Sequence, residues 1–287
     1  MQFIQAVVDG ILVGGVYAVI SIGLTLVFGV IGIINFAQAQ FLMLGMFAAY
    51  YLWLYTGIDP LFGSIIAFFV VCILGYALQK FLIDRVLNAP PLAQIFLTVG
   101  FMIVLENLAL IAFGSESHSV RTSYQMSSVA IGPLLLNVPY LAAFLISCVV
   151  GLVTWWILKR TWWGWAVRAT SQDPMAAQLV GVPPRKVYHL AFGVGVGLTA
   201  LGGAIILPYM SVSPTVGHQF GVLMFTVVVL GGLGNVLGAV IGGLAVGMIQ
   251  SLSSLVFPIQ LQNLVLFIVF ILILAFRPEG LLKRRAG

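Results

Sequence analysis

The chain has 287 residues, of which 62% are hydrophobic and only 7% are charged. A soluble globular protein has about 25% charged residues, and a chain of this length cannot bury so much apolar surface in a core of its own. The composition therefore excludes a soluble globular domain, and the continuous apolar runs, which do not alternate with polar residues, exclude a β-barrel. The sequence predicts an all-α polytopic membrane protein, and we expect residues 1–287 to form a single transmembrane domain.

The net charge is +5, and the placement of the basic residues is more informative than their number. They cluster near residues 80–90, across residues 159–187 and at the C-terminus. Basic residues are enriched in cytoplasmic loops, so these loops and the C-terminus are predicted to be cytoplasmic. No basic face on a soluble module is present to bind a nucleic acid, and we expect no such partner.

Apolar runs of membrane-spanning length follow one another along the chain. The first run has no basic leader and no small-residue cleavage site, so we expect a retained helix instead of a signal peptide. With two interruptions, at Gly29–Gln40 and Gly231–Asn235, the pattern predicts eight or nine transmembrane segments with interrupted helices. The runs cover residues 4–28, 41–56, 61–79, 92–113, 140–158, 190–209, 222–230, 236–256 and 259–276.

The two interruptions carry polar side chains at membrane depth. Non-helical backbone is tolerated there only where protein or water satisfies it. Asn35, Gln38, Gln40 and Asn235 are therefore predicted to line a translocation pathway. The alternative is that these side chains only form hydrogen bonds with neighbouring helices.

The interruptions also share a faint internal similarity at a constant offset. The matching residues are Gly32, Asn35 and Ala39 in the first interruption and Gly232, Asn235 and Ala239 in the second. Such a repeat would fit transporters in which interrupted helices occupy corresponding positions of two halves.

Glu106 is the single acidic residue well inside an apolar run. A charge at such a place marks function or a buried partner, so Glu106 is a further predicted pathway residue that could meet a substrate ammonium group. The alternatives are a protonated acid bonded to a neighbouring helix, or a carboxylate near the external end of the segment. The histidines (His118, His189 and His218) and the cysteines (Cys72 and Cys148) are dispersed, so neither a metal site nor a disulfide is expected.

Enzyme motifs are missing from the sequence. It contains no H-E-x-x-H, no G-x-S-x-G and no G-x-x-x-x-G-K-[ST] pattern. We therefore expect no enzymatic activity, no catalytic residue and no cofactor in this chain, which cannot bind ATP through a P-loop. The tryptophans between Trp155 and Trp165 border Lys159 and are typical of an interfacial aromatic belt.

The longest cytoplasmic polar stretch, Lys159–His189, contains a short helix with clear end signals. Asp173 can cap its first turn, Pro174 suits the first helical position, and Gly181 suits a left-handed C-cap. The helix predicted over 175–180 has about two turns and would not be stable alone in water. We therefore expect another protein to bind it.

Three stretches together resemble the LivH-type permeases of branched-chain amino-acid ABC transporters. The first is GLTLVFGVIGIINFAQAQFLMLG (Gly23–Gly45), and the third is GGLGNVLGAVIGG (Gly231–Gly243). Between them, Gly164–Gly181 reads G-x-A-x-R-A-T-x-Q-D-x-x-A-A-x-x-x-G and is similar to the loop of that family that contacts the ATPase. The resemblance covers essentially the whole chain.

The resemblance implies a permease of an importer for branched-chain or related amino acids in a bacterial or archaeal inner membrane. Its implied partners are a second permease in a heterodimer, two P-loop ATPases that bind the ATP, an external solute-binding protein and membrane lipid. Asn35, Phe36 and Gln38 fall in the pore-side motif of the family. The residues implied to couple to the ATPase are Gly164, Arg168, Asp173, Ala176, Ala177 and Gly181.

One departure concerns the substrate. Many relatives have a glycine followed by an acid where this chain has Ala39 and Gln40, and the family also includes importers of urea and short amides. The alternative function is a self-contained channel or facilitator for a small neutral solute such as urea or an amide.

Overall fold

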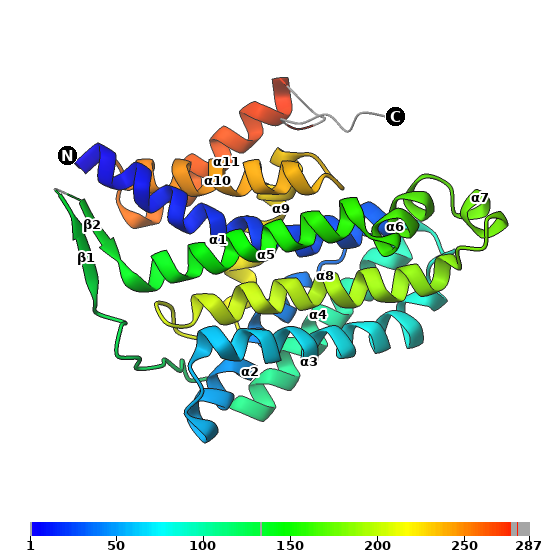
Figure 1. The fold of residues 1–287 in the computed structure, drawn as a ribbon, viewed down its shortest axis with the longest axis horizontal. Coiled ribbons are helices and arrows are strands. Elements are labelled where there is room, and N and C mark those ends of the chain that lie inside the picture. Colours follow the sequence, from blue (N-terminus) through cyan, green and yellow to red (C-terminus); the bar gives the residue numbers. More distant parts are fainter. Residues whose placement is uncertain (1, 133, 277–279, 281–287) are drawn as a thin grey trace.

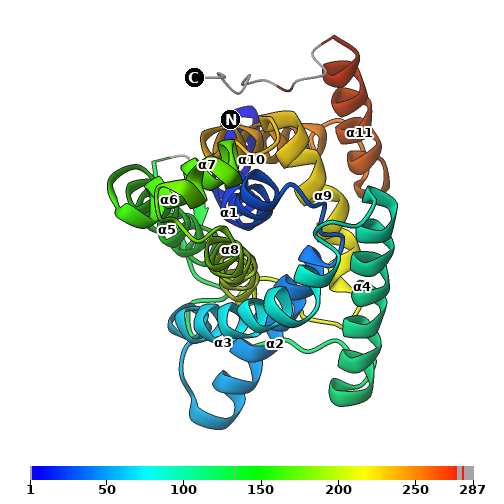
Figure 2. The same cartoon turned by 90° about the vertical axis from the view of Figure 1, so that its right-hand side faces the viewer.

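The computed structural model of the chain describes residues 2–132, 134–276 and 280, and it is a bundle of long helices (Figures 1 and 2). Shorter elements connect them: η1 (Ile83–Arg85), strands β1 (Ser128–Ile131) and β2 (Leu134–Asn137), and helices α6 (Trp162–Gln172) and α7 (Pro174–Leu179). The long helices of this described part are α1 (Gln2–Ile31), α2 (Gln38–Thr56), α3 (Pro60–Phe81), α4 (Pro91–Phe113), α5 (Val138–Arg160), α8 (Pro184–Ile206), α9 (Val216–Gly231), α10 (Val236–Ser253) and α11 (Ile259–Phe276).

Six helices of the described chain are long and apolar enough to cross a membrane. They confirm a multi-pass helical membrane protein, whereas the predicted eight or nine crossings are not confirmed by this criterion. Two further apolar helices, Val216–Gly231 and Leu264–Phe276, are shorter. The six are Gln2–Ile31, Pro60–Arg85, Pro91–Phe113, Val138–Arg160, Pro184–Ile206 and Val236–Ser253.

The two ends of the bundle differ in chemistry. Helices α6 and α7 lie at one end, beyond the basic C-terminus of α5, whereas the strands β1 and β2 lie at the other end beside the start of α1 (Figure 1). The basic end corresponds to the side predicted to be cytoplasmic. The C-terminal basic residues of that prediction, Arg277 and 283–285, lie outside the described residues.

Helices α1 and α8 form the centre of the bundle, and α4 lies at its edge (Figure 2). In the most apolar 18-residue stretch of each helix, 89% of the residues are buried in α8 but only 17% in α4. Small residues let the central helices approach closely, as in other membrane bundles. Thus a Cβ at Gly14 of α1 would lie 2.8 Å from the backbone of Gly243 in α10.

Exchanging Gly45 for alanine should destabilise the bundle. A Cβ at this position of α2 would collide with the backbone carbonyl of Ala200 in α8. Overpacking of this kind costs about 1–3 kcal/mol, so the melting temperature of the purified protein in detergent should fall. Gly100→Ala is the matched control, because a Cβ at this exposed position of α4 meets nothing within 4 Å. Equal melting temperatures for the two variants would contradict the close α2–α8 packing.

The stretch between α4 and α5, which was predicted to be external, contains a β-hairpin that the sequence analysis did not predict. Strands β1 and β2 are antiparallel, with Ser128 opposite Asn137. Gln5 of α1 holds the hairpin: its side chain donates to the carbonyl of Leu135 (2.7 Å) and accepts from the Leu135 N–H (3.1 Å). A Gly-Pro pair between two short apolar runs was the available signal in the sequence.

Candidate translocation and coupling sites

The two predicted interruptions are real breaks between helices, and the end of α1 packs against the second break. The first separates α1 from α2 and the second separates α9 from α10. Each helix that precedes a break is followed by a glycine with positive φ, Gly32 at 79° and Gly232 at 100°. The first break is shorter than predicted, because Gly29 lies in the last turn of α1 and Gln38 and Gln40 lie in the first turn of α2. A Cβ at Gly29 would lie 3.0 Å from Cα of Gly234, so the end of α1 is in close contact with the second break.

An asparagine satisfies a backbone N–H in each break. Asn35 Oδ1 accepts from the N–H of Ala37 (3.1 Å), and Asn235 Oδ1 accepts from the N–H of Gly238 (3.2 Å). Asn235 is thereby the N-cap of α10. Asn35 instead lies two residues before Ala37, the N-cap position of α2, so the two asparagines do not have the same cap role and the internal repeat stays a prediction.

Asn35 and Gln38 are fully buried and have hydrogen-bond partners inside the chain. Asn35 Nδ2 donates to Gln38 Oε1 at 3.0 Å. Gln38 Nε2 in turn donates to Thr199 Oγ1 of α8 at 2.7 Å. These bonds join the first break to the central helix, and a role of the two side chains in the pathway stays a prediction.

Gln40 differs from its neighbours because its buried amide lacks partners. Its exposed fraction is 0%, and neither Oε1 nor Nε2 has a hydrogen-bond partner among the described residues. The amide lies against the first turn of α9, where a Cβ at Gly217 would be 2.6 Å from Gln40 Oε1. A buried polar group without a partner costs about 1–3 kcal/mol.

Glu106 forms an ion pair with His218, the residue that follows Gly217 on α9. The distance between Glu106 Oε2 and His218 Nε2 is 2.8 Å, and the side chains are 15% and 54% exposed respectively. Glu106 lies seven residues before the end of α4, or about 10 Å along the helix axis. The sequence analysis singled out both residues but did not pair them.

The Glu106–His218 pair indicates that the side of the bundle on which it lies does not face lipid chains. Ionisable side chains inside a membrane face other protein segments or water, because lipid chains cannot solvate them. A half-exposed histidine beside a carboxylate therefore does not face hydrocarbon. Among the described residues, no group of three metal-ligating side chains is found, so this pair is not part of such a cluster.

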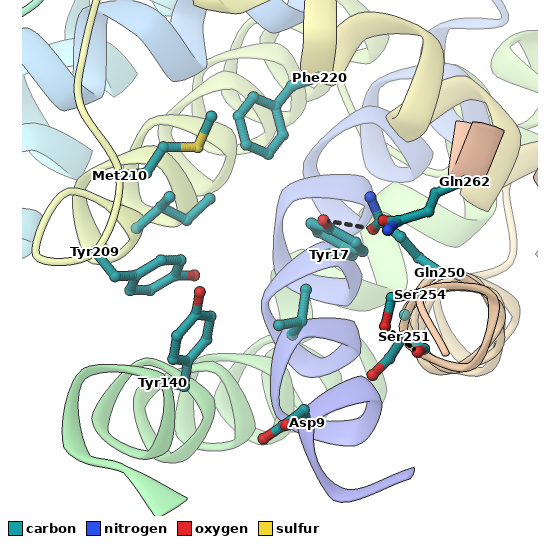
Figure 3. Close-up of a pocket in the computed structure, with 13 residues that line it drawn as sticks. Asp9, Tyr17, Tyr140, Tyr209, Met210, Phe220, Gln250, Ser251, Ser254 and Gln262 are labelled. Atoms are coloured by element: carbon teal, nitrogen blue, oxygen red, sulfur yellow. Dashed lines mark hydrogen bonds between the residues drawn. The ribbon is translucent and has the colours of Figure 1, made fainter. Parts of the chain in front are cut away.

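A polar pocket of about 330 Å³ opens between α1, α5, α9 and α10 at the end of the bundle that carries the hairpin (Figure 3). In it, the Tyr17 hydroxyl donates to Gln250 Oε1 at 2.8 Å. The rings of Tyr140 and Tyr209 are stacked, with centroids 4.3 Å apart. The volume is typical of small-ligand sites.

Asp9 supplies the negative charge of this pocket. Its carboxylate accepts two bonds from the Gln5 amide, at 3.1 and 3.2 Å, and it forms no ion pair with another described residue. The sequence analysis did not select the pocket residues. Their signal was weak: they are single polar residues in separate apolar runs, and only the fold brings them together.

The predicted short helix is confirmed as α7, with the expected end signals. Asp173 Oδ1 accepts from the N–H groups of Met175 (2.8 Å) and Ala176 (3.0 Å). Gly181 has φ +85° and follows the helix. Helix α6, which precedes α7, was not predicted, and Thr161 caps it by accepting from the N–H of Gly164 at 3.3 Å.

Helix α7 presents apolar side chains to the outside at the basic end of the bundle. Met175, Leu179 and Val180 are 79%, 89% and 76% exposed, whereas Ala177 is buried against the chain and Ala176 is exposed. Arg168 donates to the carbonyl of Leu158 and thereby holds α6 at the end of α5. An exposed apolar cluster in a polar setting is typical of a protein-binding surface.

An ion pair connects α8, the long helix that follows α7, to η1, the short segment that follows α3. His189 Nε2 lies 2.6 Å from Asp84 Oδ2, and Gln79 Nε2 donates to Asp84 Oδ1 at 3.0 Å. His189 is in the first turns of α8, and Asp84 follows α3. The pair therefore links the start of α8 to η1, the segment that follows α3.

A multi-pass helical bundle with two helix breaks and an exposed short helix at its basic end fits a membrane permease. Residues 6–274 match the family described as the branched-chain amino acid transport system/permease component, and the chain belongs to this family. The family is a membrane component of transport systems, so this chain is a transport subunit and not an enzyme. No solved structure matches the chain.

Curated relatives agree with this assignment. The chain is 28% identical to the high-affinity branched-chain amino acid transport system permease protein BraD of Pseudomonas aeruginosa, over 99% of this chain and 96% of BraD. It is likewise 28% identical to LivH of Escherichia coli K12, named as the same kind of permease, with the same coverage. The ribose import permease protein RbsC of Haemophilus influenzae is 27% identical, over 84% of this chain and 74% of RbsC. The alternative of a self-contained channel has no support among these relatives.

Proposed function

We propose that this chain is a permease subunit of an ATP-driven importer for branched-chain or related amino acids. The observation that carries the proposal is the exposed apolar side of α7, at the cytoplasmic end of a chain that has no nucleotide-binding motif. Two P-loop ATPases dock there, bind the ATP and drive transport by moving α7. The relatives are named as permease proteins of transport systems, which supports the presence of further subunits. We assign the delivery of the amino acid to an external solute-binding protein.

The second permease covers the face that carries Glu106 and His218. Helices α4 and α11 lie on this same side of the bundle (Figure 2), and their exposed apolar side chains, such as Ile111 and Ile271, suit a protein partner. The pair forms a heterodimer in the inner membrane of a bacterium or archaeon. We assign one crossing to each long helix of the described chain, nine in all, with an external N-terminus and a cytoplasmic C-terminus in line with the positions of the basic loops.

The solute path follows the same face. Glu106 meets the ammonium group of the amino acid and releases His218, and Gln40 supplies an amide without protein partners next to it. Asn35, Gln38 and Asn235 shape the neighbouring helix breaks. Asp9 in the external pocket offers a carboxylate to the ammonium group of a newly delivered solute.

Reconstitution tests this function and its alternative. The chain, its partner permease and the two ATPases in liposomes, with the binding protein outside, should take up labelled leucine, isoleucine or valine only when ATP is inside. The chain alone in the same liposomes should pass neither these amino acids nor urea. ATP-independent flux of urea or an amide through the chain alone would contradict the proposal and favour a channel.

A further inference from the structure

An apolar groove runs along the side of the bundle that lies opposite α4. It lies between α5 and α10 over a floor of α1, and its volume is about 460 Å³. The floor includes the small residues Gly15 and Ala18, and Gly151 of α5 contributes to a wall. None of the described residues that line it is charged. The outer edges are open, since Leu152 and Leu237 are 66% and 55% exposed.

The cytoplasmic end of the groove continues into a basic pocket of about 420 Å³. The groove and the pocket share Trp155, Val236 and Leu237. Lys159 and Arg168 line the pocket, and the described residues around it include no acid. The Lys159 ammonium lies 4.7 Å from the ring centroid of Trp155, which fixes it at the entrance of the groove.

The chemistry of the two spaces fits one molecule with an apolar tail and an anionic head. We propose that groove and pocket together bind an anionic phospholipid of the cytoplasmic leaflet, with an acyl chain over Gly15 and the phosphate between Lys159 and Arg168. Basic pockets between helices on the cytoplasmic side are suited to such headgroups. The positive end of the α10 dipole, at Val236 in the same pocket, adds to the attraction.

Other occupants fit only part of this arrangement. A free anion would use the two basic side chains but leave the groove empty. A transmembrane helix of another protein would fill an apolar face but would need no basic pocket at one end. A guanidinium has five N–H donors, so the bond of Arg168 to the Leu158 carbonyl leaves donors for a phosphate.

Native mass spectrometry of the full-length chain in detergent, titrated with phosphatidylglycerol, tests the site. The double variant Lys159→Gln/Arg168→Gln should bind this lipid more weakly, by about fivefold for each charge removed. Arg160→Gln is the matched control, because Arg160 is adjacent, exposed and outside the pocket. Lys159→Arg should retain binding, which separates a loss of charge from a failure to fold. Wild-type affinity in the double variant would overturn the proposal.

A second pair of measurements distinguishes the lipid from the other occupants. Gly151→Phe should fill the groove and weaken phosphatidylglycerol binding, and its nearest neighbour, Ile22 Cδ1 at 3.9 Å, leaves room for a side chain. If Gly151→Phe has no effect and inorganic phosphate displaces the lipid, the pocket is a free-anion site and the proposal is wrong. Cys148 also lines the groove. A cross-link from it to the partner permease in the assembled transporter would equally overturn the lipid assignment.

Discussion

Replacing Gly181 with valine is expected to abolish ATP-driven uptake while the chain remains inserted in the membrane. The residue has φ +85°, a conformation that a β-branched side chain reaches only at a cost of about 1–3 kcal/mol. It sets the direction in which the chain leaves α7, where the Val182 N–H bonds the carbonyl of Ala177 at 3.0 Å. A helix as short as α7 is only marginally stable, so we expect this strain to disrupt it.

The matched control is Gly57→Val. Gly57 also has a left-handed backbone, φ +71°, and a Cβ there meets nothing within 4 Å, as at Gly181. It ends α2 at the opposite end of the bundle, so the same strain is applied far from α7. We expect Gly57→Val to retain most of the uptake rate.

A second variant removes the other end signal of α7. Asp173→Pro deletes the carboxylate that caps Met175 and Ala176 and also the N–H that bonds the carbonyl of Ala169. The measurements are uptake, stimulation of the ATPase by the permease, and the amount of chain in the membrane fraction. Normal uptake in both Asp173→Pro and Gly181→Val would show that α7 does not transmit the motion.

The geometry of α7 could be predicted from the sequence because its determinants are local. Asp173, Pro174 and Gly181 lie within nine positions of one another, and each acts on backbone groups a few residues away. The two helix breaks were found for the same reason, since glycines and asparagines interrupt apolar runs. The function of these segments came from the resemblance of their motifs to a family.

Local sequence patterns could not predict contacts between segments that are far apart in the chain. Gln38 bonds Thr199 over a separation of 161 residues, and no periodicity near either residue indicates the other. Glu106 and His218 were each noticed alone, and only the fold shows that these two side chains of α4 and α9 meet. The external pocket depends on residues from separate helices, so no single stretch could predict it.

The number of membrane crossings could not be predicted from hydropathy for a different reason. Helix α9 has 16 residues and ends at Gly231, whereas a helix that spans a bilayer usually has about 20 residues. Hydropathy alone therefore does not count α9 as a crossing. Its contacts place it against the first break: its first turn packs on Gln40 at the start of α2, and the break that follows it packs on Gly29 in the last turn of α1.

Neutralising Glu106 should lower the rate of amino-acid uptake by about tenfold or more. Glu106→Gln keeps the size of the side chain but removes the charge that the proposed path offers to the solute ammonium. Hydrogen bonds to charged groups contribute about 1.5–3 kcal/mol, which corresponds to a change of tenfold or more. The measurement is ATP-driven uptake by the reconstituted transporter at saturating binding protein. Asn107→Ala is the neighbouring control, because within the described part of the chain the Asn107 amide bonds only the carbonyl of Ile103 in its own helix.

A double variant separates transport from structure. If Glu106 only holds α4 against α9, then Glu106→Gln/His218→Gln should restore both stability and uptake, because two facing amides can form a hydrogen bond in place of the ion pair. If the carboxylate meets the solute, the double variant should recover the melting temperature of the complex but not its uptake rate. The two readings therefore predict the same stability and opposite transport, so recovered uptake in the double variant would remove Glu106 from the solute path.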